Sequence, residues 1–556
     1  MTFQYEKNVF SLGKISADVV VFAPDSLSIG GEQALKATLS QGADAAVFRT
    51  SPYEAAFYCD PITLDAFSAY NCAFAVKAEV LKKLGRPKRL FGVAAANELI
   101  ARMRQSGCDV KYAPNIVAVV KDSPEPKYID ALFSSLYMRE KFGSRNDVIN
   151  GIKLVFKAIR HPKAYGTPLL PCILRGVGAD FATLWLLLLR ATKNRKYKGT
   201  LEFGETPSLG FSRGSYIFEA SREKPLVSLI TRTRNRPETL RKTLESLRHQ
   251  TYKNFEVVVV EDGEPLAEEM IKADFSNLRI TYKATVENIG RAAAANLGFS
   301  LAKGEYLNLL DDDDYLLPEH IELGVARAIG DKADVVFLRG IALETNKTGD
   351  VPYSFEIKAK RMLDFPRIEP FTMVRRCVTT QNGVMFKKKL CDAVGGMRSE
   401  LGAHEDWNLF LRLMAKGSYT VLPYATCLYI VPADRQAEKK RLLEYSKFDG
   451  ELLHDETLVF SSTKEEIAGY KRSVANDYLY LLSLGLADER LDDEYKKAKS
   501  LYGDKKPLSF AECLKNGKER LKGEELKELY YSEILCFEEY RKSGNLEEKL
   551  MENARE

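Results

Sequence analysis

The chain has 556 residues, with 82 Lys and Arg against 77 Asp and Glu, a formal net charge of +5 and 45% hydrophobic residues. A single hydrophobic core does not extend over such a length, so we expect several structural units. The composition excludes a disordered or fibrous chain, and so weak a net charge gives no case for a nucleic-acid partner.

The cysteines and apolar runs bear on the compartment. The nine cysteines stand singly, without a Cys-x-x-Cys pair, and only five histidines are present, which argues against a zinc cluster and fits reduced cytosolic thiols. The N-terminus lacks the basic and apolar regions of a signal peptide. The most apolar run, 181–189, has nine residues, whereas about 20 are needed to cross a bilayer. We expect a cytoplasmic protein, with peripheral contact at the inner face of the cell membrane left open.

Four segments differ in their sequence pattern. Residues 1–127 mix β-like runs with helical stretches and predict an α/β unit, and residues 128–222 predict a basic helical linker region. Residues 223–432 alternate strand and helix patterns, which is typical of a layered α/β sheet. Residues 433–556 are rich in Lys, Glu and Leu at helical spacing and predict a helical C-terminal region.

The linker region concentrates positive charge. Residues 151–200 contain ten Lys and Arg against one acid, Asp180. Trp185 and the leucines after it stand between basic clusters, so this stretch could lie on an anionic leaflet. The alternative is an interdomain helix with a solvated basic face.

Acidic residues follow two predicted strands of the third segment. Buried strands are expected at 226–231, 255–260, 278–282 and 305–310, a turn at 232–237, and helices at 238–249 and 291–301. Glu261-Asp262 follow the second strand, and four consecutive aspartates, 311–314, follow the fourth. Parallel strands would bring these carboxylates to the sheet edge where ligands bind. Four adjacent carboxylates repel one another, so a hard cation such as Mn²⁺ or Mg²⁺ is the natural partner. A solvated acidic turn is the alternative.

Five stretches of this segment resemble family 2 glycosyltransferases in order and spacing. They are PLVSLITRTRNRPETLRKTLESLRHQTYKNFEVVVVEDG, ENIGRAAAANLGF, GEYLNLLDDDDYLLPEH, QNGVMFKKKL and VGGMRSELGAHEDWNLFLRL. The resemblance implies an α/β, Rossmann-like GT-A domain that inverts configuration. It also implies a nucleoside-diphosphate-sugar donor, UDP- or dTDP-linked, and a glycan or lipid-linked glycan acceptor. The implied setting is bacterial surface polysaccharide synthesis.

By this resemblance, eight residues would contact the donor: Thr231, Glu261, Asp262, Asn288, Gly290, Arg291, Asp311 and Asp312. Thr231 and Asp262 would hold the base, because a carboxylate can accept a hydrogen bond from a pyrimidine N–H. Asn288 and Gly290 match an Asn-x-Gly loop near the ribose and diphosphate. Arg291 would replace an arginine that the family often carries a few residues later. The alternatives are a turn-forming Asp262 and a surface Arg291.

The resemblance makes Asp313 the metal ligand and places Asp311 or Asp312 at the ribose. The ion would bridge the donor phosphates and neutralise charge on the leaving nucleoside diphosphate. Some relatives carry a histidine after the last strand, but residues 429–432 contain none. A second metal ligand from the protein is therefore not indicated.

Glu405-Asp406 match the acidic pair of the family at a helix start. An inverting transfer needs a carboxylate that takes the proton of the acceptor hydroxyl. We assign that role to Asp406 and acceptor positioning to Glu405, with His404 and Trp407 as acceptor contacts. An acidic pair favoured by a helix dipole, a loop histidine and a core tryptophan are the alternatives.

Residues 18–120 resemble the second half of the same fold. Gly85 and Ala96 have the same separation, 11 residues, as Gly395 and Asp406, and Ala95-Ala96 stand in place of the acidic pair. This pattern predicts a non-catalytic, degenerate unit, with convergent α/β patterning as the alternative.

Two other functions remain open. A catalytically inactive glycan-binding or scaffold protein could keep the transferase fold. A sugar nucleotidyltransferase would need a glycine-rich loop after the first strand, and the RTRNRP stretch has no glycine.

Overall fold

The computed structural model describes residues 1–119 and 224–555, apart from gaps at 7–11, 24–25, 28–29, 52–58, 67–72, 86–93, 348–354, 364–367, 369–372, 375–376, 435, 438–440, 442, 444–451, 454–457, 462, 504 and 517–519. The chain divides into two compact units, Met1–Ala220 with Leu317–Glu319 and Ser221–Leu316 with His320–Glu556. The predicted basic stretch 151–200 lies outside the described residues. Among the described residues, no helix combines the length and apolar character needed to cross a membrane.

The first unit is an α/β layer around a six-stranded sheet of order β1-β2-β5-β4-β6-β3. Its strands are β1 Phe3–Glu6, β2 Val19–Phe22, β3 Ser26–Leu27, β4 Ala45–Ser51, β5 Phe74–Lys77 and β6 Val110–Val119. Its helices are α1 Gly31–Ser40, α2 Ala78–Leu84 and α3 Ala94–Gln105. Leu35 and Leu39 are buried one turn apart on α1, so this helix covers the sheet with its apolar face.

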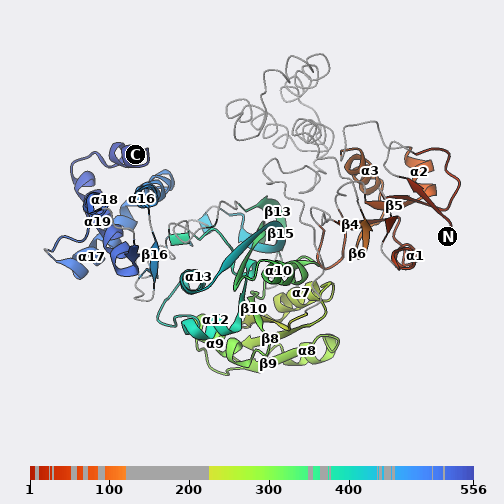
Figure 1. The fold of residues 1–556 in the computed structure, drawn as a ribbon, viewed down its shortest axis with the longest axis horizontal. Helices are drawn as coiled ribbons and strands as arrows, with labels where there is room; N and C mark the ends of the chain where they lie inside the picture. Colours follow the sequence, from red (N-terminus) through yellow and green to blue (C-terminus); the bar gives the residue numbers. More distant parts are fainter. Residues whose placement is uncertain are drawn as a thin grey trace, which may run out of the picture. The chain divides into compact units, whose positions relative to one another are not determined.

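The second unit contains a nine-stranded mixed sheet of order β11-β15-β12-β14-β10-β7-β8-β9, with β13 paired to β12 (Figure 1). Its strands are β7 Val227–Thr233, β8 Phe255–Glu261, β9 Ile280–Ala284, β10 Tyr306–Leu309, β11 Tyr315–Leu316, β12 Val335–Lys347, β13 Phe355–Met362, β14 Val384–Lys387 and β15 Tyr419–Pro432. Strands β10, β7, β8 and β9 run parallel, whereas β14 is antiparallel to both β10 and β12. The predicted α/β class is confirmed.

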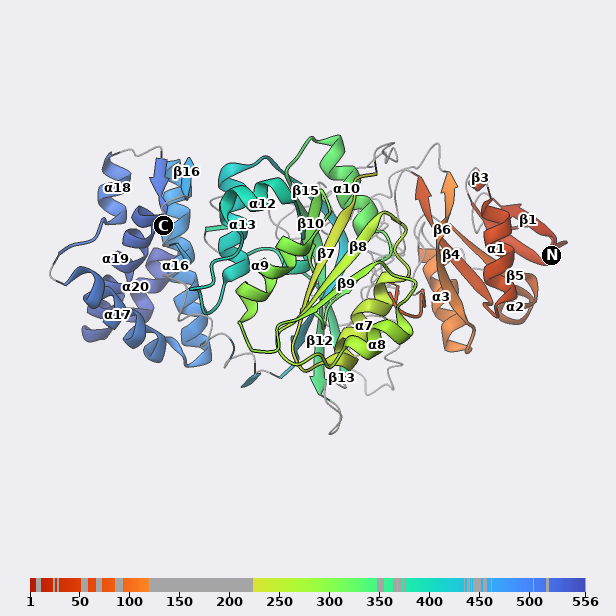
Figure 2. The ribbon, with the colours of Figure 1, turned by 90° about the horizontal axis from the view of Figure 1, so that it is seen from below.

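Helices lie along this sheet (Figure 2). They are α7 Pro237–Leu247, α8 Glu268–Asp274, α9 Arg291–Leu301, α10 His320–Gly330, α12 Lys388–Val394 and α13 Glu405–Lys416, with a 3₁₀ turn, η2, at Gln381–Gly383. Proline at the first position starts α7. Helix α9 packs closely on β7 because Gly298 has no side chain, and a Cβ there would collide with Ile230. This close packing holds α9 against β7.

The first predicted strand was too short. Strand β7 runs on to Thr233, so Arg232 and Thr233 belong to the strand and not to the predicted turn. The reason is pairing: the ladder with β8 continues as far as Thr233 opposite Glu261. Arg232 therefore has a fixed backbone at the carboxyl edge of the sheet.

The C-terminal part of the second unit is mainly helical. Its elements are β16 Val459–Ser461, α16 Lys464–Leu484, α17 Ala487–Tyr502, α18 Phe510–Asn516, β17 Arg520–Lys522, α19 Gly523–Lys542 and α20 Leu546–Asn553. Thr463 and Glu466 form a capping box at the start of α16. The two short strands pair antiparallel, and helical periodicity alone does not reveal them.

The sheet of the first unit repeats the strand plan of the larger sheet. The order β3-β6-β4-β5-β2-β1 corresponds to β11-β15-β12-β14-β10-β7. Each of the five strand pairs is parallel or antiparallel as its counterpart is. Arg102 on α3 donates to the Leu84 carbonyl, and Arg412 on α13 donates to the Val394 carbonyl. We propose that the first unit is a degenerate copy of this half-fold, as its sequence indicates.

Candidate active site

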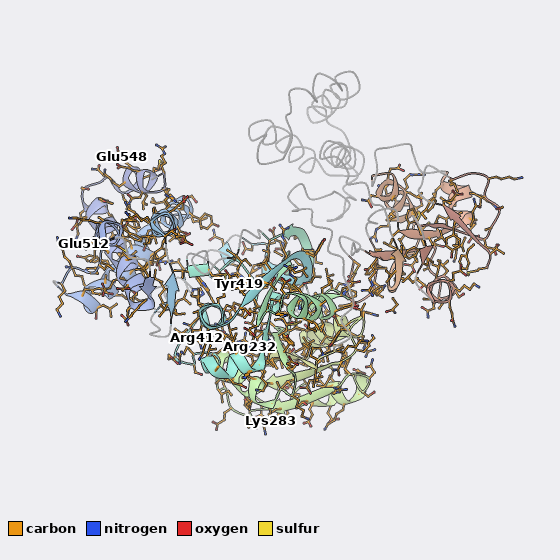
Figure 3. All side chains as sticks on the ribbon, viewed as in Figure 1. Arg232, Lys283, Arg412, Tyr419, Glu512 and Glu548 are labelled. Atoms are coloured by element: carbon orange, nitrogen blue, oxygen red, sulfur yellow. The ribbon has the colours of Figure 1, made fainter. Side chains whose placement is uncertain are left out.

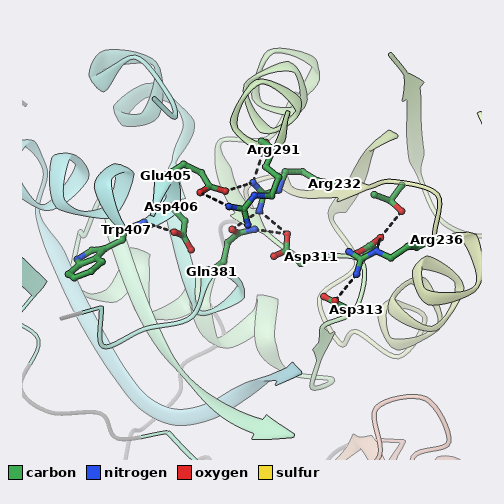
Figure 4. Close-up of polar contacts among 11 residues, drawn as sticks. Arg232, Arg236, Arg291, Asp311, Asp313, Gln381, Glu405, Asp406 and Trp407 are labelled. Atoms are coloured by element: carbon green, nitrogen blue, oxygen red, sulfur yellow. Dashed lines mark hydrogen bonds and ion pairs between the residues drawn. The ribbon is translucent and has the colours of Figure 1, made fainter. Parts of the chain in front are cut away.

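Arg232 is the centre of the polar cluster at the carboxyl edge of the large sheet (Figure 4). Its side chain is 8% exposed. Nη2 donates to Asp311 Oδ1 at 3.0 Å and to Gln381 Oε1 at 2.7 Å. Nη1 donates to Glu405 Oε1 and to the carbonyl of Arg291, both at 3.2 Å. One guanidinium thus contacts the acidic run, the start of α9, η2 and the start of α13.

A second arginine binds the middle of the acidic run. Arg236 Nε donates to Asp312 Oδ2 at 3.0 Å, and Nη1 donates to Asp313 Oδ2 at 2.9 Å. Thr233 Oγ1 also donates to Asp312 Oδ2, at 2.6 Å. Asp312 is fully buried, whereas Asp311 and Asp313 keep 33% and 34% of their side chains exposed. Asp311 and Asp313 are therefore the members of the run that a ligand can reach.

Burial and mutual repulsion act on the protonation of this run. Burial raises the pKa of Asp312 to about 7, although Arg236 opposes that shift. Burial and the Asp311 charge also raise the pKa of Asp313. Asp314 is buried, and its Oδ1 accepts a hydrogen bond from the Ile430 amide at 3.0 Å. It therefore ties the run to β15.

The end of β8 is joined to the loop before α9. Asp262 Oδ1 accepts from the Ile289 amide at 2.7 Å, and its Oδ2 accepts from the Gly290 amide at 3.1 Å. Asn288 Oδ1 accepts from the same Gly290 amide at 3.2 Å. Gly290 has φ of 89° and directly precedes α9, a conformation that glycine adopts without strain. Asp262 thus fixes the Asn-x-Gly loop.

Two predicted donor contacts are closed to solvent. Thr231 and Glu261 are both fully buried. Glu261 Oε2 accepts from the Ala267 amide at 2.9 Å and from the Tyr282 hydroxyl at 2.6 Å. The Thr231 hydroxyl has no hydrogen-bond partner among the described residues. Their contact with a donor base stays a prediction.

Helix α13 begins with the acidic pair. Glu405 is 4% exposed and lies 3.5 Å from Arg291 Nη2 as well as 3.2 Å from Arg232 Nη1. Asp406 Oδ1 accepts from the Trp407 amide at 2.7 Å. Burial and the adjacent Glu405 raise the pKa of Asp406, while Arg232 and His404 lower it. A raised pKa suits a carboxylate that accepts a proton during a reaction.

His404 and Trp407 lie beside this pair. His404 precedes α13 with φ of 63°, a strained conformation for a residue with a side chain, of the kind found at functional sites. Its ring meets that of Trp407 edge-on, with centroids 5.2 Å apart. Trp407 Nε1 donates to the Met373 carbonyl at 2.6 Å. The indole is partly buried, so one end is held while part of the ring stays accessible.

A divalent cation fits this edge only together with a ligand. Asp313 offers a partly exposed carboxylate in a region where aspartates outnumber arginines, and hard cations prefer such oxygens. Within the described part of the chain, no group of three or more Asp, Glu, His or Cys side chains is arranged to hold a metal. Asp313 would therefore need phosphate oxygens or water to complete the coordination.

The structure brings six of the predicted residues into one network: Asp262, Asn288, Gly290, Arg291, Asp311 and Glu405. It runs from Asp262 through Gly290 and Arg291 to Arg232, and from there to Asp311 and Glu405. Sequence reasoning missed three residues of the site, which are Arg232, Arg236 and Gln381. The signal for the arginines was their density in RTRNRP, next to a predicted acidic edge. Gln381 gave no such signal.

A family model and several curated proteins match this chain. Residues 228–395 match the family model described as glycosyl transferase family 2. A relative in Bacillus subtilis named "Putative glycosyltransferase EpsH" is 35% identical over 131 residues, covering 23% of this chain and 38% of that relative. The uncharacterized glycosyltransferase YwdF of the same organism is 28% identical over 228 residues, covering 39% of this chain and 81% of that relative.

A solved structure, mannosyltransferase PcManGT from Pyrobaculum calidifontis in complex with GDP-Man and Mn²⁺, is 16% identical and covers 60% of this chain and 87% of that one, with a TM-score of 0.35. A likeness at this level does not define the ligands of this chain. The matched residues extend from β7 through α12 and include the acidic run Asp311–Asp314. Residues 228–395 therefore form a domain that resembles the family 2 glycosyltransferases.

Proposed function

We propose that this protein is an inverting, metal-assisted glycosyltransferase. It moves a sugar from a nucleoside-diphosphate-sugar, UDP- or dTDP-linked, to a glycan or lipid-linked glycan acceptor. Bacterial surface polysaccharide synthesis at the cytoplasmic side of the membrane is the setting that the family resemblance indicates. The observation that supports the proposal best is the meeting of the acidic run and the acidic pair at Arg232.

The donor would lie along the carboxyl edge of β7, β8 and β10. The loop at Asn288 and Gly290, fixed by Asp262, would lie against the ribose and diphosphate. Asp311 is the better candidate for the ribose hydroxyls because Asp312 is fully buried. Arg291, 53% exposed at the start of α9, is available to the diphosphate.

The cation would be held by Asp313 and the donor phosphates. Mn²⁺ or Mg²⁺ at this position would neutralise charge on the leaving nucleoside diphosphate. Arg236, which binds both Asp312 and Asp313, would keep the Asp313 carboxylate in place.

The reaction needs a single displacement. The acceptor oxygen attacks the anomeric carbon, its proton passes to the Asp406 carboxylate, and the bond between the anomeric carbon and the diphosphate oxygen breaks with its electron pair on the diphosphate. One displacement inverts the configuration. Glu405 would orient the acceptor, and Trp407 and His404 would contact its sugar ring.

The test is hydrolysis of a panel of nucleotide sugars, with and without Mn²⁺. We expect one donor class to turn over, and Asp313→Ala and Asp406→Asn to lose most of this activity. Asp274→Asn, a change at a surface ion pair with Arg241, is the control that should match the wild type. Donor binding without turnover would favour the inactive glycan-binding alternative. Wild-type rates in both site variants would refute the proposal.

A further inference from the structure

Arg232 is a charged side chain in a buried position, where an unpaired cation would destabilise the fold. Its guanidinium is buried, and a buried charge must be paired and hydrogen-bonded. Burial works against its charge, yet Asp311 and Glu405 raise the pKa of Arg232 overall. The two carboxylates come from different elements, one after β10 and one at the start of α13. The arginine therefore joins the two acidic elements by charge as well as by hydrogen bonds.

Gln381 fixes the direction of this arginine. Its Oε1 accepts from Arg232 Nη2 at 2.7 Å, and its Nε2 donates to Asp311 Oδ1 at 2.8 Å. Arg232 Nη2 donates to the same Asp311 oxygen at 3.0 Å. The three side chains thus close a ring of hydrogen bonds. Only a group with both an acceptor and a donor can complete it, which an amide does and a carboxylate does not.

A second buried arginine shows how a purely structural one is bound. Arg412 on α13 (labelled with Arg232 in Figure 3) donates to Asn408 Oδ1 and to the carbonyls of Val394 and Gly396. These partners are neutral and hold α13 to α12. Arg232 instead binds two carboxylates that the proposed function places on opposite sides of the reacting centre.

We propose that Arg232, oriented by Gln381, is a positioning residue that holds the donor-side Asp311 and the acceptor-side Glu405 in one fixed relation and thereby sets the charge around Asp406. The assignment of Asp311 to the donor side and of Glu405 to the acceptor side rests on the proposed function. The electrostatic effect of Arg232 at the start of α13 does not depend on that function.

The charged and titratable groups around Asp406 predict the direction in which its pKa shifts when Arg232 is removed. Glu405 raises the pKa of Asp406, while Arg232 and His404 lower it. The Asp406 charge in turn raises the pKa of the Cys377 thiol, after the larger effect of burial. Removing the Arg232 cation leaves Glu405 with Arg291 as its remaining arginine partner and takes away a positive charge that acts on Asp406. The proton affinity of Asp406 must then rise.

Trp407 allows this to be measured without any substrate. The chain has two tryptophans, Trp185 and Trp407, and the Trp407 amide binds the Asp406 carboxylate directly. In a Trp185→Phe, His404→Gln background, the pH dependence of tryptophan emission reports the protonation of Asp406 with the neighbouring imidazole removed. We expect Arg232→Met to move the midpoint up by about one pH unit, and Gln381→Met to move it in the same direction by less.

Arg412→Met is the matched control. It should weaken folding but leave the emission midpoint in place, because it binds the Asn408 amide and two carbonyls and is not among the charges that shift the pKa of Asp406. An unchanged midpoint in Arg232→Met, or no transition in the background protein between pH 4 and 9, would overturn the proposal. If Arg232→Met does not fold, Gln381→Met decides in the same assay.

Kinetics separate this inference from the proposed function. With a donor that the wild type hydrolyses, Arg232→Met should lower kcat and raise KM together, and Gln381→Met should lower kcat/KM about 10-fold, the loss expected for hydrogen bonds to charged groups. If the wild type accepts no donor, the proposed function fails while the emission result still decides the role of Arg232. Unchanged kcat and KM in both variants would refute the positioning role.

Discussion

Arg232 Nη1 and Glu405 Oε1 lie 3.2 Å apart although 173 positions separate the two residues in the sequence. Strand β7 supplies the arginine and α13 supplies the carboxylate. Strand β7, the first strand of the large sheet in chain order, is thus joined to the helix that carries the proposed base. A single buried side chain, Arg232, thus contacts groups on both sides of the proposed site.

Asp406→Asn should remove most of the turnover while leaving donor binding intact. The amide keeps the shape of the side chain but does not accept a proton, and general-base catalysis contributes about 10²–10⁴-fold to a rate. Steady-state kinetics with a saturating acceptor would show this as a fall in kcat with little change in the donor KM. An equal loss in Asp274→Asn would point to a general effect of the substitution and contradict this assignment.

The pH profile should have an acidic limb that belongs to Asp406. Burial and Glu405 raise its folded-state pKa, and the base works only when deprotonated. Activity should therefore be full at high pH and be lost as pH falls through that raised pKa, above the ordinary range of an aspartate. Measurement of kcat/KM from pH 4 to 9 checks this. A rate that stays constant down to pH 4 would argue against Asp406 as the base.

Removal of the metal should abolish transfer. EDTA treatment is expected to stop the reaction, and Mn²⁺ or Mg²⁺ should restore it, because charge on the leaving diphosphate needs a counter-ion. Asp313→Ala should need a higher Mn²⁺ concentration or fail to respond. Full activity of the wild type in EDTA would contradict a metal-assisted reaction.

His320 should make folding sensitive to acid. It is fully buried, its ring nitrogens lie 3.0 Å from Asn308 Oδ1 and 2.9 Å from Thr426 Oγ1, and burial lowers its pKa to about 3. The folded state therefore holds a neutral ring, whereas the unfolded chain binds a proton near pH 6.5. Its contribution to stability is complete above pH 6.5 and is lost as pH falls from there toward 3.

Urea unfolding at pH 7 and pH 5 measures this effect. His320→Gln keeps polar atoms and does not titrate, so part of the difference between the two pH values should disappear. His249→Gln, at a partly exposed position, is the control that should keep it. The same pH difference in wild type and His320→Gln would refute the prediction.

The sequence predicted the elements whose pattern is local. The apolar run of β8 and the helical spacing of α9 were enough to place both. The run at Asp311–Asp314 and the pair at Glu405-Asp406 were found because carboxylates at a strand end and at a helix start are conspicuous.

Long-range contacts were beyond such reasoning. Nothing local distinguishes Asp312, which is fully buried, from Asp311 and Asp313, which are not. Arg232 lies in a stretch whose composition predicts a turn, whereas its pairing with β8 makes it part of a strand. The role of Gln381 depends on Arg232 and Asp311, which are 149 and 70 positions away in the sequence. A periodic pattern does not predict contacts over such separations.

The stereochemistry of donor hydrolysis tests the central claim most directly. An α-linked nucleoside-diphosphate-sugar that the wild type hydrolyses should be followed by proton NMR, in which the anomers of the released sugar are resolved. A single displacement assisted by Asp406 predicts that the β-anomer appears first and that Asp406→Asn slows its release. Release of the α-anomer first would contradict the account.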